Sequence, residues 1–134
     1  MPTIFSKIIN GDIPCHKVAE SEDFLAFLDI SPLRAGHTLV IPKLEVDYIF
    51  DLDDDLYARL FTFAKKVGKA VESVVDCERI GIAVIGLEVP HAHIHLSPID
   101  RLSDLDFTKQ RVQLTQEEFS SLASKIHTAF VSSN

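Results

Sequence analysis

The sequence is short of cysteine, of tryptophan and of positive charge. Its 134 residues include two cysteines, Cys15 and Cys77, and no tryptophan. Two cysteines do not make the disulfide framework of a small secreted domain, which favours a cytoplasmic location. Lysine and arginine number 13 against 20 acidic residues, a formal net charge of −7. Because a nucleic-acid surface needs several Lys or Arg contacts to phosphates, this balance argues against a nucleic-acid partner.

Long hydrophobic runs are also missing. No stretch of 18 apolar residues occurs, so the sequence predicts no membrane span and no membrane partner. The first residues lack the basic and apolar regions of a signal peptide. The length and the 46% of hydrophobic residues predict one domain over 1–134. A small anionic ligand is compatible with the acidic chain if backbone N–H groups and histidines hold it locally.

Three segments carry apolar residues at helical spacing. The first is 3–9, with Thr3 as a candidate N-cap. The longest is 51–75, where acidic residues at the start suit the helix dipole. The last covers about 115–131, and its first residues, Thr115 to Glu118, form a capping-box pattern.

Five segments are expected to be strands, at 17–20, 24–29, 37–42, 80–85 and 92–99. The run 80–85 is continuously apolar, which predicts a central strand buried on both faces. A short turn separates it from 92–99 and predicts an antiparallel hairpin, whereas 100–114 reads as polar and irregular. The sum is an α+β fold: an antiparallel five-stranded sheet with one long and one C-terminal helix.

Half of the six histidines lie in the last predicted strand, at every second position: His91, His93 and His95. Successive side chains of a strand point to opposite faces, so these three would share one face at intervals of about 6.6 Å. The apolar residues between them would point into the core. Imidazole is the side chain whose ordinary pKa lies nearest to neutral pH. The pattern therefore predicts chemistry on this face.

The spacing alone leaves three interpretations open. The histidines could ligate zinc or iron, with His37, Glu88 or Asp29 as further ligands. They could instead act without a metal, by nucleophilic or acid–base catalysis. The third interpretation is structural, with imidazoles that are exposed or satisfied by hydrogen bonds.

The run from His91 to Ser97 resembles the His-x-His-x-His-x-x signature of the histidine triad (HIT) nucleotide-binding superfamily, in which x is apolar. Segments 4–14, 27–32 and 36–43 are similar to the family's opening segment, its nucleoside-binding strand and its next strand. They occur in the family's order and at its usual spacing. The resemblance covers about 3–100, is closest to the Hint-like purine nucleoside phosphoramidase branch, and implies a HIT-like fold.

The resemblance implies a covalent mechanism that needs no cofactor and no metal. His93 matches the histidine that attacks the α-phosphorus, giving a nucleotidyl-histidine that water hydrolyses. His91 would position it through a nearby backbone carbonyl and contribute to the phosphate site. His95 would stabilise charge or donate a proton as an imidazolium. His37 matches a further family histidine that supports the cluster.

The resemblance also implies a nucleotide site. Asp29 matches the carboxylate that accepts hydrogen bonds from both ribose hydroxyls. A slot for the base would be formed by Phe5, Ile8, Phe27 and Leu39. A loop containing Gly86, Glu88 and Val89 would bring backbone N–H groups to the phosphate.

Three positions depart from the family pattern. Many relatives have a serine near the scissile phosphate where this chain has Glu88, whose charge would repel a phosphate unless it turns away or is protonated. Ser6 and Glu45 stand where some relatives have a cysteine and a histidine, which argues against their structural zinc site.

The expected function is hydrolysis at the α-phosphate of purine nucleoside 5′-monophosphate derivatives, phosphoramidates above all. A dinucleoside polyphosphate hydrolase or a nucleotidyl transferase of the same family is the alternative enzyme. A nucleotide sensor without turnover and a metal-dependent protein are the alternatives from other classes. The expected partners are an AMP- or GMP-like ligand and, from the resemblance, a second copy of the chain paired through the long helix and the strand beside it.

Overall fold

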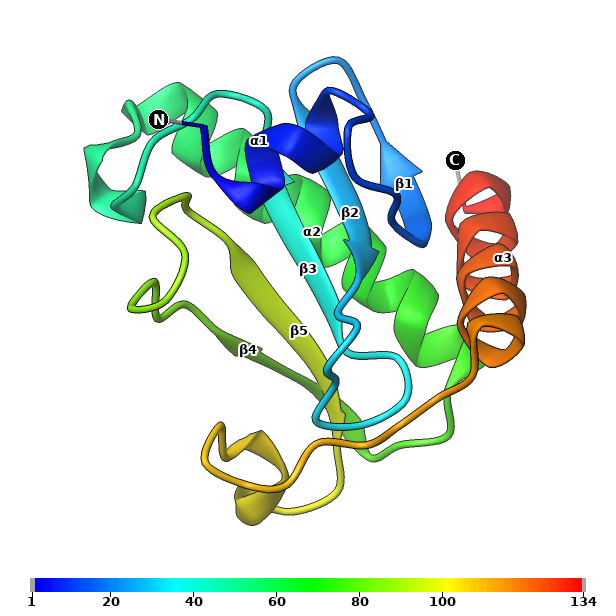
Figure 1. Cartoon of the computed structure of the whole chain (residues 1–134). Helices are drawn as coiled ribbons and strands as arrows, with labels where there is room; N and C mark the ends of the chain where they lie inside the picture. Colours follow the sequence, from blue (N-terminus) through cyan, green and yellow to red (C-terminus); the bar gives the residue numbers. More distant parts are fainter. Residues whose placement is uncertain (1, 134) are drawn as a thin grey trace.

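The structure is a computed structural model that describes residues 2–133. An antiparallel sheet in the order β1-β2-β3-β5-β4 forms its centre (Figure 1). The strands are β1 (Lys17–Glu20), β2 (Phe24–Leu28), β3 (Thr38–Pro42), β4 (Arg79–Ala83) and β5 (Ile94–Ile99). The helices are α1 (Ile4–Ile9), α2 (Asp54–Val74) and α3 (Gln116–Ser132), with short 3-10 turns η1 (Ile49–Asp51) and η2 (Leu102–Leu105). The predicted α+β class and five-stranded antiparallel sheet are confirmed.

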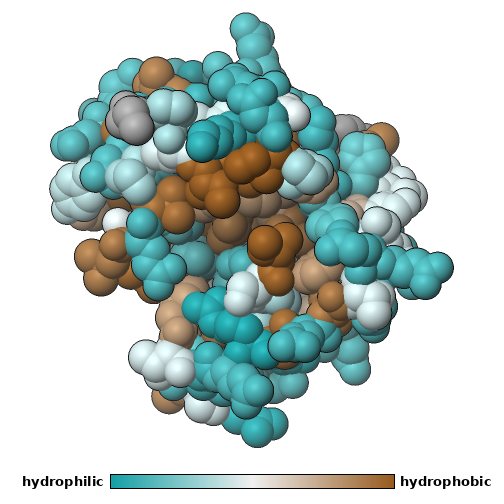
Figure 2. Space-filling model, in the orientation of Figure 1, coloured by the Kyte–Doolittle hydropathy of each residue, from teal (hydrophilic) through white to brown (hydrophobic). Residues whose placement is uncertain are grey.

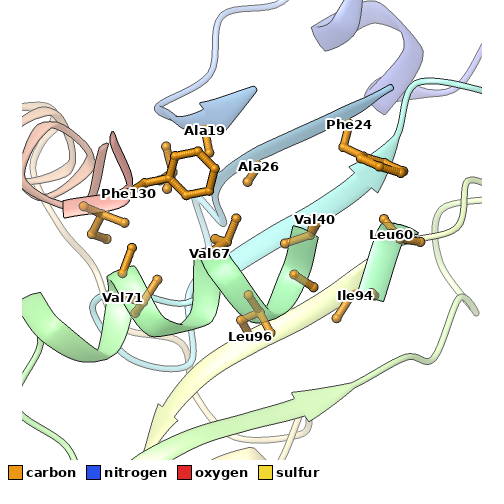
Figure 3. Packing of buried hydrophobic residues seen from close by; sticks show 14 of the residues in the cluster. Ala19, Phe24, Ala26, Val40, Leu60, Val67, Val71, Ile94, Leu96 and Phe130 are labelled. Carbon is orange, nitrogen blue, oxygen red and sulfur yellow. The ribbon is translucent and has the colours of Figure 1, made fainter. Parts of the chain in front are cut away.

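One face of the sheet packs against α2 and α3 and holds the main hydrophobic core. Figure 3 shows side chains of both helices directed at this face, among them Val67, Val71 and Phe130. They meet alternate residues of the strands, such as Val40 and Leu96. Because strand side chains alternate, the residues between them point to the opposite face.

The opposite face carries α1 and a second, smaller hydrophobic cluster. The cluster consists of Phe5, Leu25, Phe27, Leu39 and Ile41. Figure 2 shows hydrophobic residues gathered near the middle of this side of the molecule, with hydrophilic residues around them. The strand register pairs Phe27 with Leu39 and Leu39 with His95. A row of side chains across three strands therefore joins the hydrophobic cluster to the histidine strand.

The helix starts follow local caps. Thr3 and Thr115 cap α1 and α3 as predicted, and Glu118 completes the capping box. The predicted start of the long helix at Asp51 is wrong by three residues. The Asp53 side chain accepts the Leu56 N–H at 2.8 Å, so the helix begins after that cap. Within residues 2–133, none of the helices is both long and apolar enough to cross a membrane.

The prediction of a central strand at 80–85 is wrong. β4 ends at Ala83 and lies at the edge of the sheet, paired with β5 alone. Ile82 is 55% exposed and Ile85 is 45% exposed. An apolar run predicts burial, but among the described residues no strand pairs with the outer edge of β4. The predicted antiparallel pairing of this strand with the histidine strand is confirmed.

Candidate active site

The histidine strand is shorter than predicted. β5 begins at Ile94, so His91 and His93 lie in the loop that connects it to β4. The cause is a local change of partner, because Ala92 donates its N–H to Val46 O at 2.7 Å rather than to a strand of the sheet. The rings of His93 and His95 nevertheless lie side by side, with centroids 4.9 Å apart.

The tautomer of His93 is set by its own loop. Nδ1 of His93 lies 2.7 Å from the carbonyl oxygen of His91. A carbonyl only accepts, so Nδ1 carries the proton, and neutral imidazole then has a lone pair on Nε2. Among the described residues no buried side-chain nitrogen lacks a partner, so this unpartnered Nε2 reaches solvent. The ring therefore offers an accessible nucleophilic nitrogen.

His95 has the opposite tautomer, which is set through His37. The Leu33 N–H donates to Nδ1 of His37 at 3.0 Å, which leaves the proton of His37 on Nε2. That Nε2–H lies 3.0 Å from Nδ1 of His95 and donates to it. His95 therefore carries its own proton on Nε2, which has no hydrogen-bond partner within residues 2–133. A lone pair on His93 and an N–H on His95 are thus available from adjacent rings.

His91 is buried and supports the loop that carries His93. Its ring is fully buried, its Nε2–H donates to Pro42 O at 2.8 Å, and Thr3 Oγ1 lies 3.1 Å from its Nδ1. Both ring nitrogens are thus engaged by protein atoms. The edge of the Phe5 ring packs on both His91 and His93. His91 therefore holds the loop whose carbonyl orients His93.

Burial keeps the rings of His37, His93 and His95 neutral. It lowers the pKa of His37 to about 3 and, together with the neighbouring His93, lowers that of His95 to about 4. It also lowers the pKa of His93, although the hydrogen bond to the His91 carbonyl opposes the shift. A low pKa leaves an imidazole unprotonated at neutral pH, which a nucleophile requires.

Asp29 follows β2 directly and stands beside the histidines. Its Oδ1 accepts the Ser31 N–H at 2.8 Å, and its Oδ2 lies 3.7 Å from Nε2 of His37. The side chain is 17% exposed. Burial raises the pKa of this carboxyl, and the hydrogen bond from Ser31 together with the charge of Arg111 opposes that rise. A partly exposed carboxylate at this place can accept hydrogen bonds from a ligand.

The residues predicted to form the base slot come together. Phe5, Phe27 and Leu39 belong to the smaller cluster, and Ile8 packs against it. Val89 packs there too, so the loop after β4 touches the same cluster. The five residues of this cluster are at most 6% exposed, and the partly buried side chains of Ile8 and Val89 pack against them.

The loop after β4 contains a glycine turn and one carboxylate. Gly86 has a φ of +75°, a conformation that favours glycine. Glu88 is exposed, and its negative charge acts to raise the pKa of both Asp29 and His93. Glu88 is thus one of the charges that act on both groups. A cavity of about 630 Å³ adjoins this loop, with Gly86, Leu87 and His93 in its wall.

Three of these groups also lie close enough to hold a metal ion. Asp29, His37 and His95 each offer one ligand atom, and these atoms lie within 4.8 Å of one another. Nε2 of His37 lies 3.7 Å from Oδ2 of Asp29 and 3.0 Å from Nδ1 of His95, whereas Nδ1 of His37 accepts the Leu33 N–H. A metal ion bound by Nε2 of His37 would therefore have to replace the hydrogen bond between His37 and His95.

Two side chains that the sequence did not indicate also border the site, Phe107 and Arg111. The Phe107 ring packs edge-on against His95 at 4.7 Å and lies 6.1 Å from the His37 ring. Arg111 donates from Nη1 to Ser31 O at 2.7 Å. Both come from the segment 100–114, which was predicted as irregular. Its one aromatic residue, Phe107, was the available signal.

Comparisons with known proteins agree on one family. The sequence model of the HIT domain family matches residues 10–102 of this chain. The chain is 42% identical to adenosine 5′-monophosphoramidase hnt1 of Schizosaccharomyces pombe over 100 residues, which cover 73% of this chain and 74% of that protein. It is 36% identical to an uncharacterized HIT-like protein of Borreliella burgdorferi over 131 residues, or 92% and 94% of the two chains. A crystal structure of a HIT-like protein from Bartonella henselae matches with a TM-score of 0.81 at 30% identity, covering 95% of each chain.

The buried histidines predict a loss of stability in mild acid. Unfolded histidine has a pKa near 6.5, above the folded values of about 3 for His37 and about 4 for His95. Below pH 6.5 the unfolded chain therefore binds more protons, and the free energy of unfolding falls with pH. Each of the two rings should remove about 2 kcal/mol between pH 7 and pH 5.

Urea unfolding at several pH values tests this prediction. His95→Gln should have a shallower dependence of unfolding free energy on pH than the wild type, because one titrating ring is gone. Ser120→Ala, an exposed change on α3 that removes no titratable group, should keep the wild-type slope. Equal slopes in all three proteins would contradict the assignment of a neutral, buried His95.

Proposed function

This chain belongs to the HIT domain family, and we propose that it is a nucleotide hydrolase that cleaves purine nucleoside 5′-phosphoramidates at the α-phosphorus. One observation carries the proposal: Nε2 of His93 is held unprotonated by the 2.7 Å hydrogen bond from Nδ1 to the His91 carbonyl. A fixed lone pair beside the N–H of His95 suits attack on a phosphorus atom. The similarity to a monophosphoramidase of S. pombe supports the substrate class.

The first chemical step forms a nucleotidyl-histidine. The lone pair of His93 Nε2 makes a bond to phosphorus, and the bond from phosphorus to the leaving nitrogen breaks with its electrons on that nitrogen. The Nδ1–H of His93 keeps its hydrogen bond to the carbonyl, which stabilises the positive charge that the ring gains. Water then attacks phosphorus, the electron pair returns to Nε2, and the released amine takes the proton that water loses.

His95 acts in this scheme as a hydrogen-bond donor. Its Nδ1 already accepts the His37 N–H, so a second proton on His95 would break that bond. We therefore assign the Nε2–H of His95 to the phosphoryl oxygens, where it stabilises developing negative charge. The leaving nitrogen must then carry its own proton into the site, as an N-protonated phosphoramidate does.

Glu88 favours such a leaving group. Its carboxylate acts on both His93 and Asp29, so its charge is felt where the substrate would lie. It attracts a protonated nitrogen and repels a second phosphate. This distinction supports the phosphoramidase over the dinucleoside polyphosphate hydrolase, which is the second candidate function.

The nucleotide would lie across the front of the sheet. Asp29 is proposed to accept hydrogen bonds from the two ribose hydroxyls, and the smaller hydrophobic cluster to receive the purine. The phosphate would meet the loop residues from Gly86 to Val89. We expect the protein to act in the cytoplasm, which its two unpaired cysteines, Cys15 and Cys77, support.

Replacing His93 tests the mechanism. His93→Ala should reduce hydrolysis of adenosine 5′-phosphoramidate by at least about 1,000-fold, since the nucleophile is lost. AMP binding, measured by calorimetry, should survive, because the ribose and base contacts remain. His127→Ala, a change on α3 where His127 binds Val18 O, should keep wild-type activity.

Three further observations decide among the alternatives. Intact mass after rapid quenching should reveal a nucleotidyl adduct on the wild type, and EDTA should leave its rate unchanged. Substantial turnover by His93→Ala would refute the covalent mechanism. Loss of wild-type activity in EDTA, with zinc or iron retained through gel filtration, would favour the metal-dependent alternative.

Replacing Glu88 tests the leaving-group assignment. Glu88→Gln should lower kcat/KM for adenosine 5′-phosphoramidate and raise it for diadenosine triphosphate, shifting the ratio by about tenfold, the effect of 1.4 kcal/mol. Glu22→Gln, an exposed change in the turn before β2, should leave the ratio unchanged. A ratio unmoved by Glu88→Gln would show that this carboxylate does not select the leaving group.

We also propose a homodimer formed through β4 and α2. The free edge of β4 can pair with the same strand of a second copy about a two-fold axis. Apolar side chains along this edge and the loop after it are exposed, with Ile82 at 55% and Leu87 at 88%. Burying them between two copies would remove this apolar surface from water.

Sedimentation equilibrium tests the dimer. The wild type should have twice the 15.0 kDa mass of the chain at micromolar concentration, and Ile82→Lys should have the monomer mass. Leu102→Lys, a matched change at a side chain that is 98% exposed in η2, should remain dimeric. A wild-type monomer would refute the proposal.

A further inference from the structure

The segment that follows the matched family region folds back onto the nucleotide site. The family model ends at residue 102, and the following residues return to the turn after β2. Val112 donates its N–H to Pro32 O at 2.9 Å, and Arg111 donates from Nη1 to Ser31 O at 2.7 Å. Two consecutive residues thus bind two consecutive carbonyls of that turn.

The same turn holds Asp29. The Ser31 N–H donates to Asp29 Oδ1 at 2.8 Å. Ser31 therefore binds the Asp29 carboxylate through its N–H and the Arg111 guanidinium through its carbonyl oxygen. Any shift of Ser31 moves the hydrogen-bond donor that orients the carboxylate. The position of Asp29 therefore depends on Arg111 through a chain of two hydrogen bonds.

The Arg111 side chain is itself fixed by Phe107. Its Nη2 donates to Phe107 O at 3.3 Å, and the guanidinium carbon lies 5.6 Å from the centre of the Phe107 ring. That ring packs against His95 at 4.7 Å. Phe107 thus joins the arginine to the wall of the histidine site. A planar guanidinium can donate to a carbonyl oxygen and pack against an aromatic ring at the same time, which a lysine ammonium does less well.

We propose that Arg111 is a positioning residue that sets specificity for the ribose hydroxyls, by fixing the Asp29–Ser31 turn so that the carboxylate can accept hydrogen bonds from both. This rests on the proposed function, in which Asp29 receives the ribose. The charge of Arg111 also opposes the effect of burial on Asp29 and favours its ionised form. An ionised, fixed carboxylate accepts two hydroxyl hydrogen bonds, whereas a loose or protonated one loses that preference.

Binding of three nucleotides to the full chain tests the proposal. Calorimetry would compare AMP with 2′-deoxy-AMP and 3′-deoxy-AMP for the wild type and Arg111→Gln. The wild type should bind AMP more tightly than either analogue, and Arg111→Gln should reduce this preference at least fivefold. A role limited to folding would weaken all three nucleotides together and leave their ratios unchanged.

Two further variants complete the design. Lys109→Gln removes a positive charge from the same segment, where Lys109 lies 3.8 Å from Asp104, and should keep the wild-type preference. Arg111→Lys retains the charge but not the planar donor, and should have an intermediate preference. If Arg111→Gln does not fold, Arg111→Lys takes its place in the comparison. A preference for AMP over the deoxy analogues equal to that of the wild type would then overturn the proposal.

The outcomes separate this proposal from the proposed function. A wild type that does not bind AMP would refute the nucleotide site itself. A wild type that prefers AMP, with the same preference in Arg111→Gln, would refute only the role of Arg111. A reduced preference in Arg111→Gln with no change in Lys109→Gln is the expected result.

Discussion

The hydrogen bond from Nδ1 of His93 to the carbonyl of His91 is the interaction on which the site depends. At 2.7 Å it fixes the proton on one nitrogen and leaves the other free to react. A second set of bonds, from the Leu33 N–H through His37 to His95, fixes the opposite tautomer on the adjacent ring. Neighbouring rings thus offer one free lone pair and one N–H without a charged partner, which suits the proposed attack on an anionic substrate.

The sheet makes this arrangement possible because one of its faces packs the main core and the other carries the histidine site. One face is committed to α2 and α3, and its packing holds β3 and β5 in register (Figure 3). The other face is left to α1, the smaller hydrophobic cluster and the histidines. His95 lies opposite Leu39 in that register, so the reactive groups are placed by the same pairing that holds the core together. His93 lies in a loop outside this pairing, and contacts with His91 and Phe5 hold it in place.

The sequence predicted the features that depend on local patterns. The caps at Thr3 and Thr115 are read from neighbouring residues, and the apolar stripe of α2 from its period. The edge position of β4 was missed because an apolar run looks alike whether it is covered by its own chain or left at an edge. Phe107 and Arg111 were missed because they meet His95 and the turn after β2 through folding between distant segments, which no local pattern encodes. The Leu33 N–H lies only four residues from His37, but a backbone donor carries no signal of its own in the sequence. The family resemblance supplied the candidate residues and the backbone carbonyl that holds His93. It implied an imidazolium at His95, whereas the structure has a neutral ring there that accepts the His37 N–H.

The most direct test of the account is the tautomeric state of the histidines, measured by ¹⁵N NMR of the imidazole nitrogens at pH 7. The account predicts that His93 is neutral with its proton on Nδ1, and that His95 is neutral with its proton on Nε2. His93→Ala and His95→Gln would assign the two signals. A His93 ring protonated on Nε2, or a His95 ring carrying two protons at pH 7, would contradict the account.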